Sequence, residues 1–306
     1  GARAVLKAVR IQALWSGYGQ ILRVSLEGGD WPSVIVKHIS PPASANHPRG
    51  WDTAIGHQRK LRSYQVEKAW YRQHLVASDD WRTARFIAAK SIPNGQLIVM
   101  EDLDAAGFPE RRHGLTMREM KACLSWLAHF HATYLGKDPV GLWEEGTYWH
   151  LDTRPLEWHE MREGPLKERA KQIDAVLKNC RYRTFVHGDA KVANFCFGLD
   201  GSVAAVDFQY VGGGCGMKDV AYFMSSCLDE DGCARHQVEL LDHYFDVLRK
   251  VVALEAAETQ RLEDEWRSLY PIAWADFTRF LEGWVPTHWK LHRYSRKMVD
   301  LTLKQL

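Results

Sequence analysis

The chain has 306 residues, a length that suits two domains or lobes rather than one small core. Hydrophobic residues make up 46% of it and the net charge is +2, so the composition is that of an ordinary globular protein and gives no reason to expect a nucleic-acid or membrane partner. The six cysteines form no C-x-x-C pair, which argues against a zinc or redox motif and favours a reducing, cytoplasmic setting.

The N-terminal part of the chain predicts a small antiparallel sheet with one or two helices. Residues 1–15 are basic and lack acids, and we expect a first surface helix there, with a targeting peptide as the alternative. Residues 20–39 alternate apolar and polar side chains on either side of "EGGD", which predicts two strands joined by a turn. Residues 41–50 are rich in Pro and Gly and predict a loop, and residues 57–77 show helical spacing. A further strand is expected over residues 96–103, after the turn "PNG".

The chain becomes mainly helical after Leu103, so we predict an N-terminal lobe over residues 1–103 and a C-terminal lobe over residues 104–306. Thr116 and Glu119 form a capping-box pattern ahead of a helix that Gly136 could close. One apolar face of this helix comprises Leu124, Leu127, Phe130, His131 and Tyr134.

Helical periodicity recurs in two later stretches. It covers residues 160–178 and residues 234–252, the second with an apolar face that starts at Val238. Between them, "SVAAV" (202–206) predicts a short buried strand.

The stretch "FVHGDAKVANFCF" places strongly polar side chains between two hydrophobic anchors. Asp189 and Asn194 lie five residues apart on a predicted loop, and Asp207 follows at the end of the apolar strand. If the chain folds back there, Asn194 and Asp207 supply the hard oxygen ligands that suit Mg²⁺ bound to a polyphosphate. Asp189 could then orient or deprotonate a hydroxyl, and Lys191 could neutralise charge on a transferring phosphoryl group.

The N-terminal part offers matching anchors for a nucleotide. Lys37 is the only lysine between residues 8 and 59, on a predicted strand, and Glu67 is the only glutamate between residues 28 and 100, on a predicted helix. A strand lysine held by a helix glutamate is the protein-kinase arrangement for the α- and β-phosphates.

Two further features suit a nucleotide site. "SGYG", with Gly17 and Gly19, supplies a short glycine loop, although the motif alone is weak because such a sequence is usually only a turn. Glu101 and Leu103 stand where linker backbone could meet an adenine.

These motifs resemble the aminoglycoside phosphotransferase and choline kinase superfamily. "HGDAKVAN" and "VDFQYVGGGCGMKDVAYF" carry the resemblance, and "VEKAWY", "VMEDL" and "LAHFHA" bring it closest to the ecdysteroid-kinase-like branch. The likeness spans roughly residues 14–226 and leaves the last 80 residues without a matched motif.

The resemblance implies an α+β, two-lobed, protein-kinase-like fold, with a small N-terminal lobe around an antiparallel sheet and a larger, mainly helical C-terminal lobe. It implies Mg²⁺-dependent transfer of the ATP γ-phosphate to a small-molecule hydroxyl. In this scheme Asp189 is the catalytic aspartate, Asn194 and Asp207 are the metal ligands, and Lys37 and Glu67 are the phosphate-binding pair. Asp219 would brace the catalytic loop.

Other interpretations stay open at this stage. One is a nucleotide-binding pseudokinase scaffold without transfer activity. A protein kinase is another, favoured by the D-x-K-x-x-N spacing at Lys191; against it, "KDVAYF" follows Asp207 too closely to leave room for a long activation loop. His187 is expected to be structural, and "VGGGCG" (211–216) to be a flexible loop that lacks the Lys-Ser/Thr of a Walker motif.

The acceptor is the least constrained feature of the sequence. Residues 1–103 hold 14 Lys and Arg against 8 Asp and Glu, whereas the rest holds 26 against 30, so a cationic acceptor is possible. Trp274, Trp284 and Trp289 could instead wall a pocket for a hydrophobic alcohol, or a cation through cation–π contact, with core packing as the alternative for each.

Overall fold

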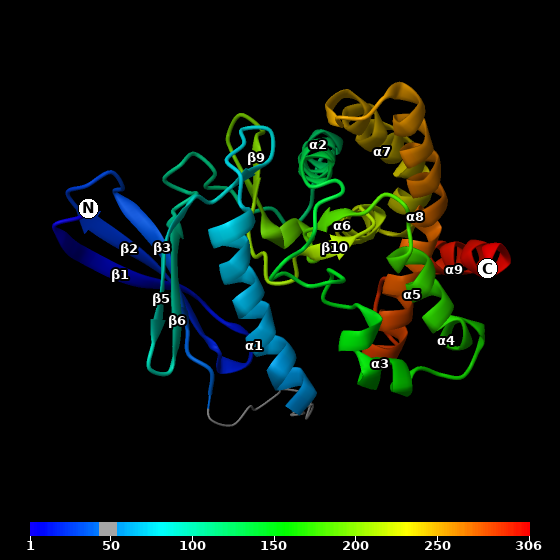
Figure 1. Cartoon of the computed structure of the whole chain (residues 1–306), viewed down its shortest axis with the longest axis horizontal. Coiled ribbons are helices and arrows are strands. Elements are labelled where there is room, and N and C mark those ends of the chain that lie inside the picture. Colours follow the sequence, from blue (N-terminus) through cyan, green and yellow to red (C-terminus); the bar gives the residue numbers. More distant parts are fainter. Residues whose placement is uncertain (43–53) are drawn as a thin grey trace. The chain divides into compact units, whose positions relative to one another are not determined.

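The computed structural model describes residues 1–42 and 54–306, which form two compact units (Figure 1). The first unit comprises residues 1–111 and 196–209, and the second comprises residues 112–195 and 210–306. The lobe boundary at residue 103 stays a prediction. Residues 196–209, which follow the polar loop, belong to the same unit as the N-terminal part of the chain. Apart from its first two residues, the predicted loop over residues 41–50 lies outside the described residues.

A five-stranded antiparallel sheet is the centre of the first unit (Figure 1). Its strands, in spatial order, are β1 (Ala4–Ala13), β2 (Gly19–Glu27), β3 (Ser33–Ile39), β6 (Gly95–Glu101) and β5 (Phe86–Ile92). The predicted strands over residues 20–39 and 96–103 are therefore confirmed. The alternating pattern in β3 and β6 places Lys37, Ile39 and Ile98 on one face of the sheet, and all three are buried.

The expected N-terminal surface helix is wrong, because β1 is an edge strand. It pairs with β2 in antiparallel register, from Ala4 opposite Glu27 to Ala13 opposite Gln20, and all its residues are exposed. A helix in this segment would have no buried face to stabilise it. In the strand, β-branched residues gain the ladder hydrogen bonds of β2, and Lys7 and Arg10 protect an exposed edge from further pairing.

The predicted helix after the loop is confirmed as α1 (Ala54–Ala69), continued by one π-helical turn, η2 (Trp70–His74). It is tied to the sheet by Gln96 of β6, whose amide donates to the Tyr64 carbonyl at 3.1 Å. A smaller sheet has the order β4-β9-β8 and comprises β4 (Arg82–Thr83), β9 (Val203–Ala205) and β8 (Phe195–Phe197). β9 is the short buried strand that "SVAAV" predicts.

The second unit is mainly helical, as expected. α2 (Met117–Thr133) begins with the predicted capping box, because the Thr116 side chain accepts from the Glu119 N–H and the Glu119 side chain accepts from the Thr116 N–H. The predicted apolar face of α2 is buried. The helix ends at Thr133, and Gly136 follows it with a φ of 70°. The other long helices are α6 (Met217–Cys227), α7 (Glu230–Val251), α8 (Ala256–Trp284) and α9 (Arg293–Gln305).

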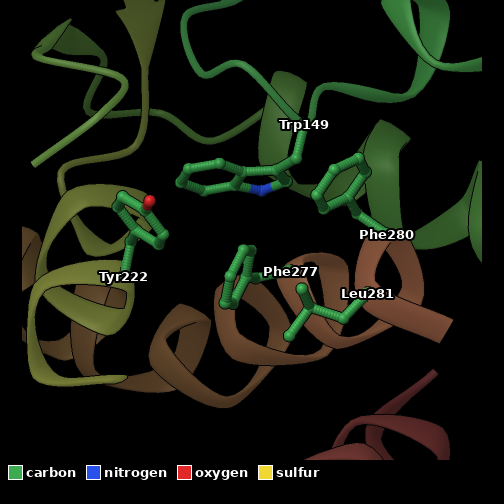
Figure 2. Packing of buried hydrophobic residues seen from close by; sticks show 5 residues of the cluster. All are labelled: Trp149, Tyr222, Phe277, Phe280 and Leu281. Atoms are coloured by element: carbon green, nitrogen blue, oxygen red, sulfur yellow. The ribbon is translucent and has the colours of Figure 1, made fainter. Parts of the chain in front are cut away.

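Aromatic packing joins the long helices to the segment that follows α2. Figure 2 shows Tyr222 of α6 and Phe277, Phe280 and Leu281 of α8 around the Trp149 side chain. The Trp149 ring lies 4.8 Å from Tyr222 and 5.1 Å from Phe277, between ring centroids. Its indole N–H donates to Asp276 of α8 at 3.0 Å, so this fully buried polar group has a partner.

Two helical expectations need correction. The periodicity over residues 160–178 does not make one helix: α3 (Pro155–Glu160) ends there, α4 (Pro165–Glu168) starts anew at a proline, and α5 (Ala170–Lys178) follows. Gly164, with a φ of 157°, breaks the run before Pro165. In α7 the core face does not include Val238, which is 67% exposed.

The stretch "VGGGCG" is a buried strand rather than a flexible loop. β10 (Gly212–Gly214) pairs antiparallel with β7 (Thr184–Val186), and all three glycines are buried. A Cβ on Gly212 would lie 2.2 Å from the Trp143 carbonyl oxygen. The glycines are needed because another backbone segment passes this strand at close range.

No helix in the described part of the chain is long and apolar enough to cross a bilayer. Each of the six cysteines is a free thiol.

Candidate active site

Lys37 is the centre of a polar cluster in the first unit, which we call the lysine cluster (Lys37, Glu67, Asp207 and Gln209). The Lys37 side chain extends from β3 and is 3% exposed. Its Nζ lies 2.9 Å from Glu67 Oε1 and 2.7 Å from Oε2, with hydrogen-bond geometry only to Oε1, and 3.1 Å from Asp207 Oδ1. The structure therefore forms the expected pair and adds the aspartate.

The charge of Lys37 follows from these partners. Burial on its own would lower the pKa of Lys37, but the carboxylates of Asp207 and Glu67 outweigh it and raise that pKa. Lys37 thus stays an ammonium although it is almost inaccessible to solvent. The charged hydrogen bonds with Glu67 and Asp207 hold this ammonium in a fixed position.

Asp207 is held in an unusual backbone conformation at the end of β9. Its φ is 69°, a left-handed value that costs a residue with a side chain about 1 kcal/mol or more. Gln209 donates to Asp207 Oδ1 at 2.5 Å, and in turn accepts from Lys60 at 2.9 Å and Ser63 at 3.1 Å, both on α1. The intervening Phe208 stacks on Trp70 with ring centroids 4.7 Å apart. Helix α1 therefore fixes this turn as well as Lys37.

Gln209 and its partners on α1 were not among the predicted site residues. Their only sequence signal is the polar Asp-x-Gln spacing after the apolar strand. Nothing in the sequence pairs Gln209 with Lys60 and Ser63, which precede it by about 150 residues.

The two predicted loop glycines have different structural roles. Gly17 has a φ of 75° and no atom within 4 Å of the position of a Cβ, so it lies in open space. Gly19 has a φ of 131°, and a Cβ there would lie 2.0 Å from the His38 carbonyl oxygen. The close approach of β2 to β3 thus explains why residue 19 is a glycine, whereas the space around Gly17 leaves room for a ligand.

Glu101 and Leu103 lie at the end of β6. The Glu101 carboxylate pairs with Arg82 at 2.5 Å and accepts from the Arg85 N–H at 3.0 Å, so its side chain is occupied by its own unit. Leu103 is buried, and its carbonyl accepts from Phe108 N–H at 2.8 Å. Any contribution of this segment to a ligand site would come from backbone atoms.

The predicted polar loop lies in the second unit, between β7 and β8, and we call residues 187–194 the aspartate loop. Asp189 is 6% exposed. Its Oδ2 accepts from Lys191 Nζ at 2.8 Å and from Asn194 Nδ2 at 2.9 Å, and its Oδ1 accepts from Tyr222 OH at 3.1 Å. The structure thus brings Asp189, Lys191 and Asn194 together and adds Tyr222 of α6.

Burial and the neighbouring Tyr148 and Asp189 raise the pKa of Tyr222 well above its ordinary value, so its phenol stays a donor. Asn194 Nδ2 also donates to the Asp189 carbonyl at 2.8 Å. The amide nitrogen is therefore committed to the loop, which directs the amide oxygen away from it.

The aspartate loop is shaped by Gly188 and Asp219. Asp219, fully buried at the start of α6, accepts from the His187 and Gly188 N–H groups, the latter at 2.9 Å, and lies 3.2 Å from His131 Nε2. This is the bracing contact that the resemblance implies. Gly188 has a φ of 79°, and a Cβ there would lie 2.1 Å from the Tyr210 carbonyl oxygen. His187 is buried and its Nδ1 accepts from the Asp189 N–H, in keeping with a structural role.

The three C-terminal tryptophans differ in their surroundings. Trp274 is buried and donates to Ser295 at 3.0 Å, so it is a core residue. Trp284 is half-buried and stacks on Phe280 at 5.6 Å between centroids. Trp289 is 59% exposed and stacks on His288. Trp284 and Trp289 therefore stay candidates for contact with a ligand.

The two predicted metal ligands belong to different units, Asp207 to the first and Asn194 to the second. The lysine cluster and the aspartate loop are thus each assembled within one unit. Together they contain the predicted catalytic residues, the phosphate-binding pair and the two predicted metal ligands.

Comparison with known proteins assigns the family. The model of the ecdysteroid kinase-like family matches residues 59–135 and 157–256, which is more than half of the chain. The chain belongs to the ecdysteroid kinase-like family. This membership confirms the resemblance drawn from the sequence motifs. The matched segments of this ecdysteroid kinase-like protein include Glu67, the aspartate loop and Asp207.

Solved structures show the same fold at low identity. An amicoumacin kinase, solved in complex with AMP-PNP, Ca²⁺ and Ami, has 14% identity over 97% of this chain and 87% of its own, with a TM-score of 0.53. The choline kinase LicA of Streptococcus pneumoniae has 13% identity over 99% and 95%, with a TM-score of 0.51. An ethanolamine kinase of Plasmodium vivax has 12% identity over 96% and 80%, with a TM-score of 0.53.

The three similar structures are those of small-molecule kinases, and the likeness confirms the predicted α+β, protein-kinase-like fold. Identities of this size concern the fold alone. Among curated proteins, none matches the sequence.

Proposed function

We propose that this protein is a small-molecule kinase that transfers the γ-phosphate of ATP to an alcohol hydroxyl with the help of Mg²⁺. The observation that carries the proposal is the coexistence of the lysine cluster and the aspartate loop in a member of a kinase-like family. Each cluster supplies one half of what phosphoryl transfer needs: positive charge for the phosphates, and a carboxylate that orients the nucleophile.

In the first unit, Lys37 would bind the α- and β-phosphates of ATP, with Glu67 holding the ammonium in position. The buried pair supports this role because an ammonium fixed by charged hydrogen bonds loses little entropy when it binds an anion. Gly17 would lie near the phosphates, where an open and flexible backbone is useful. The end of β6, with the backbone of Glu101 and Leu103, would meet the adenine.

In the second unit, Asp189 would accept a hydrogen bond from the acceptor hydroxyl and orient it toward the γ-phosphate. Lys191 and Asn194 already donate to Oδ2, whereas Tyr222 is the only donor to Oδ1 among residues 1–42 and 54–306. The hydroxyl would therefore approach Oδ1. Lys191, 2.8 Å from Asp189, would move its charge toward the transferring group, which would offset charge that develops on the phosphoryl oxygens.

The donor set fits Mg²⁺. Asp207 offers a carboxylate that is 35% exposed, and Asn194 offers an amide oxygen directed away from Asp189. Hard oxygen ligands in small number are what Mg²⁺ takes when it is bound to a polyphosphate. When bound, the ion would neutralise phosphate charge; Lys37 already holds Asp207 in place through Oδ1.

The test is transfer of the γ-phosphate from ATP to pools of alcohols, amino alcohols, sugars and sterols. Asp189→Asn and Asp207→Ala should each reduce transfer by roughly 10³-fold or more while the protein stays folded. Asp300→Asn, an exposed carboxylate on α9, is the matched control and should keep full activity. Wild-type-like transfer by either site variant would refute the mechanism. ATP binding without transfer to any pool would favour the nucleotide-binding scaffold instead.

A cytoplasmic location is part of the proposal. Five of the six free thiols are buried, and burial raises the pKa of Cys215 well above its ordinary value, so that thiol is unreactive.

A further inference from the structure

Lys290 is a buried lysine that the proposed chemistry does not use. It lies in the segment between α8 and α9 and is 9% exposed. No carboxylate in residues 1–42 or 54–306 forms an ion pair with it; its Nζ hydrogen bond goes to the neutral Ser225 hydroxyl at 3.4 Å. A buried ammonium without an anionic partner is costly, so its presence needs a reason.

The Lys290 ammonium is surrounded by aromatic rings. Its Nζ lies 5.2 Å from the centroid of Tyr222, 5.3 Å from that of Phe277 and 5.5 Å from that of Trp289. Rings at such distances around a positive charge are the arrangement by which proteins recognise ammonium ligands. In this protein the chain's own lysine fills that arrangement, which we call the lysine-filled cage (Lys290, Tyr222, Phe277 and Trp289).

The cage is directly connected to the aspartate loop. Tyr222 contributes its ring to the cage, while its hydroxyl donates to Asp189 Oδ1 at 3.1 Å. In Figure 2 the Tyr222 and Phe277 rings lie beside each other, and the Tyr222 hydroxyl points away from Phe277. The Lys290 charge is therefore one ring away from the oxygen that would meet the acceptor hydroxyl.

Packing alone does not explain an ammonium at this position. A lysine stem often covers aromatic surface with its charge in water, but here the charge itself lies against the rings. A methionine would fill a similar volume without desolvating a charge. The exposed Trp289 ring and half-buried Trp284 leave apolar surface beside the cage that an acceptor can cover.

We infer that Lys290 determines acceptor specificity: it excludes alcohols that carry a positive charge and selects uncharged or anionic alcohols that present an oxygen atom to its amine. This inference rests on the proposed function for the reaction and adds the class of acceptor. In the aromatic cage, the position that could otherwise bind a cationic acceptor is filled by the Lys290 ammonium, which would repel it. The Lys191 ammonium, bound to Asp189, would add to this repulsion. An acceptor oxygen, by contrast, would supply the partner that Lys290 lacks.

The experiment compares acceptors that differ in charge but not in shape. Choline and its uncharged isostere 3,3-dimethylbutan-1-ol form one pair, and amino alcohols matched with diols and hydroxy acids form the others. Transfer from ATP·Mg²⁺ and the shift in Tm on binding are measured for the wild type, Lys290→Met, Lys290→Arg and the control Lys297→Met, an exposed lysine on α9.

In the wild type, each uncharged or anionic member should bind and react at least tenfold better than its cationic counterpart. Lys290→Met should reduce this preference at least tenfold and allow cationic alcohols to bind, whereas Lys290→Arg and Lys297→Met should keep it. A wild type that uses cationic alcohols equally well overturns the inference, as does an unchanged preference in Lys290→Met.

Failure of the proposed function has a different signature. In that case no pool is phosphorylated, yet the Tm shifts still show whether ligand preference follows charge and whether Lys290 sets it. If Lys290→Met does not fold, the wild-type preference decides the question, because equal use of cationic alcohols overturns the inference.

Discussion

Replacing Lys290 with methionine should stabilise the protein at neutral pH. Burial is the main influence on this lysine and lowers its pKa from 10.5 to about 8; Lys191 acts in the same direction, and Cys227, Asp189 and Cys233 oppose it. A folded pKa below the unfolded one means that the unfolded chain binds the proton more tightly. The buried ammonium therefore lowers the free energy of unfolding by its full amount below pH 8, and this destabilisation decreases as the pH rises toward 10.5.

The magnitude follows from the difference between the two pKa values. A difference of about 2.5 corresponds to about 3 kcal/mol of destabilisation at pH 7 and less than about 1 kcal/mol at pH 10. Cation–π attraction to the rings of the cage offsets about 1 kcal/mol at pH 7. Lys290→Met should thus raise the free energy of unfolding by about 2 kcal/mol at pH 7, with most of the gain lost at pH 10.

Urea unfolding of the wild type, Lys290→Met and Lys297→Met at pH 7 and pH 10 measures this effect. The exposed Lys297 provides the same chemical change without burial, so its variant should differ little from the wild type at both values. The reasoning is refuted if Lys290→Met is less stable than the wild type at pH 7, or if its stability change is the same at both values. A stabilising replacement would also show that the lysine does not serve folding.

Three further predictions concern the framework of the site. Asp219→Asn should lower kcat for transfer at least tenfold and reduce the free energy of unfolding by about 2–4 kcal/mol. The reason is that the amide cannot accept from both loop N–H groups and His131. Steady-state kinetics and urea unfolding measure the two effects. Gly212→Ala should destabilise by more than about 2 kcal/mol, since its Cβ would meet the Trp143 carbonyl, whereas Gly114→Ala, with open space around it, should be nearly neutral in the same measurement. Thr116→Ala should cost about 1 kcal/mol of stability through loss of the capping box and leave transfer unchanged.

Much of the fold and of the candidate site follows from local sequence. Alternation predicts β2, β3 and β6, and the capping box fixes the start of α2. Lys37 and Glu67 were paired correctly because each is the only residue of its kind in a long stretch. A pairing can be predicted from the sequence when each charged group has a single possible partner in its part of the chain.

The errors come from features that depend on distant parts of the chain. β1 carries a pattern that a helix could also use, and only the presence of β2 as a pairing edge decides between them. The glycines of β10 are typical of a loop, and only the passage of the Trp143 segment shows why they form a strand. Lys290 gives no local signal, since its rings come from α6, α8 and its own segment.

The donors around Asp189 relate Lys191 to the acceptor. Lys191 and Asn194 share Oδ2, and Tyr222 binds Oδ1, so the carboxylate is held from two sides. Lys191 supplies positive charge on the Oδ2 side, and Lys290 supplies it behind the Tyr222 ring on the Oδ1 side. The ammonium groups of Lys191 and Lys290 repel a cationic alcohol that approaches this carboxylate, while they leave an uncharged hydroxyl free to dock. Lys191 and Lys290 therefore argue for the same acceptor class from independent contacts, one with the aspartate and one with the aromatic cage.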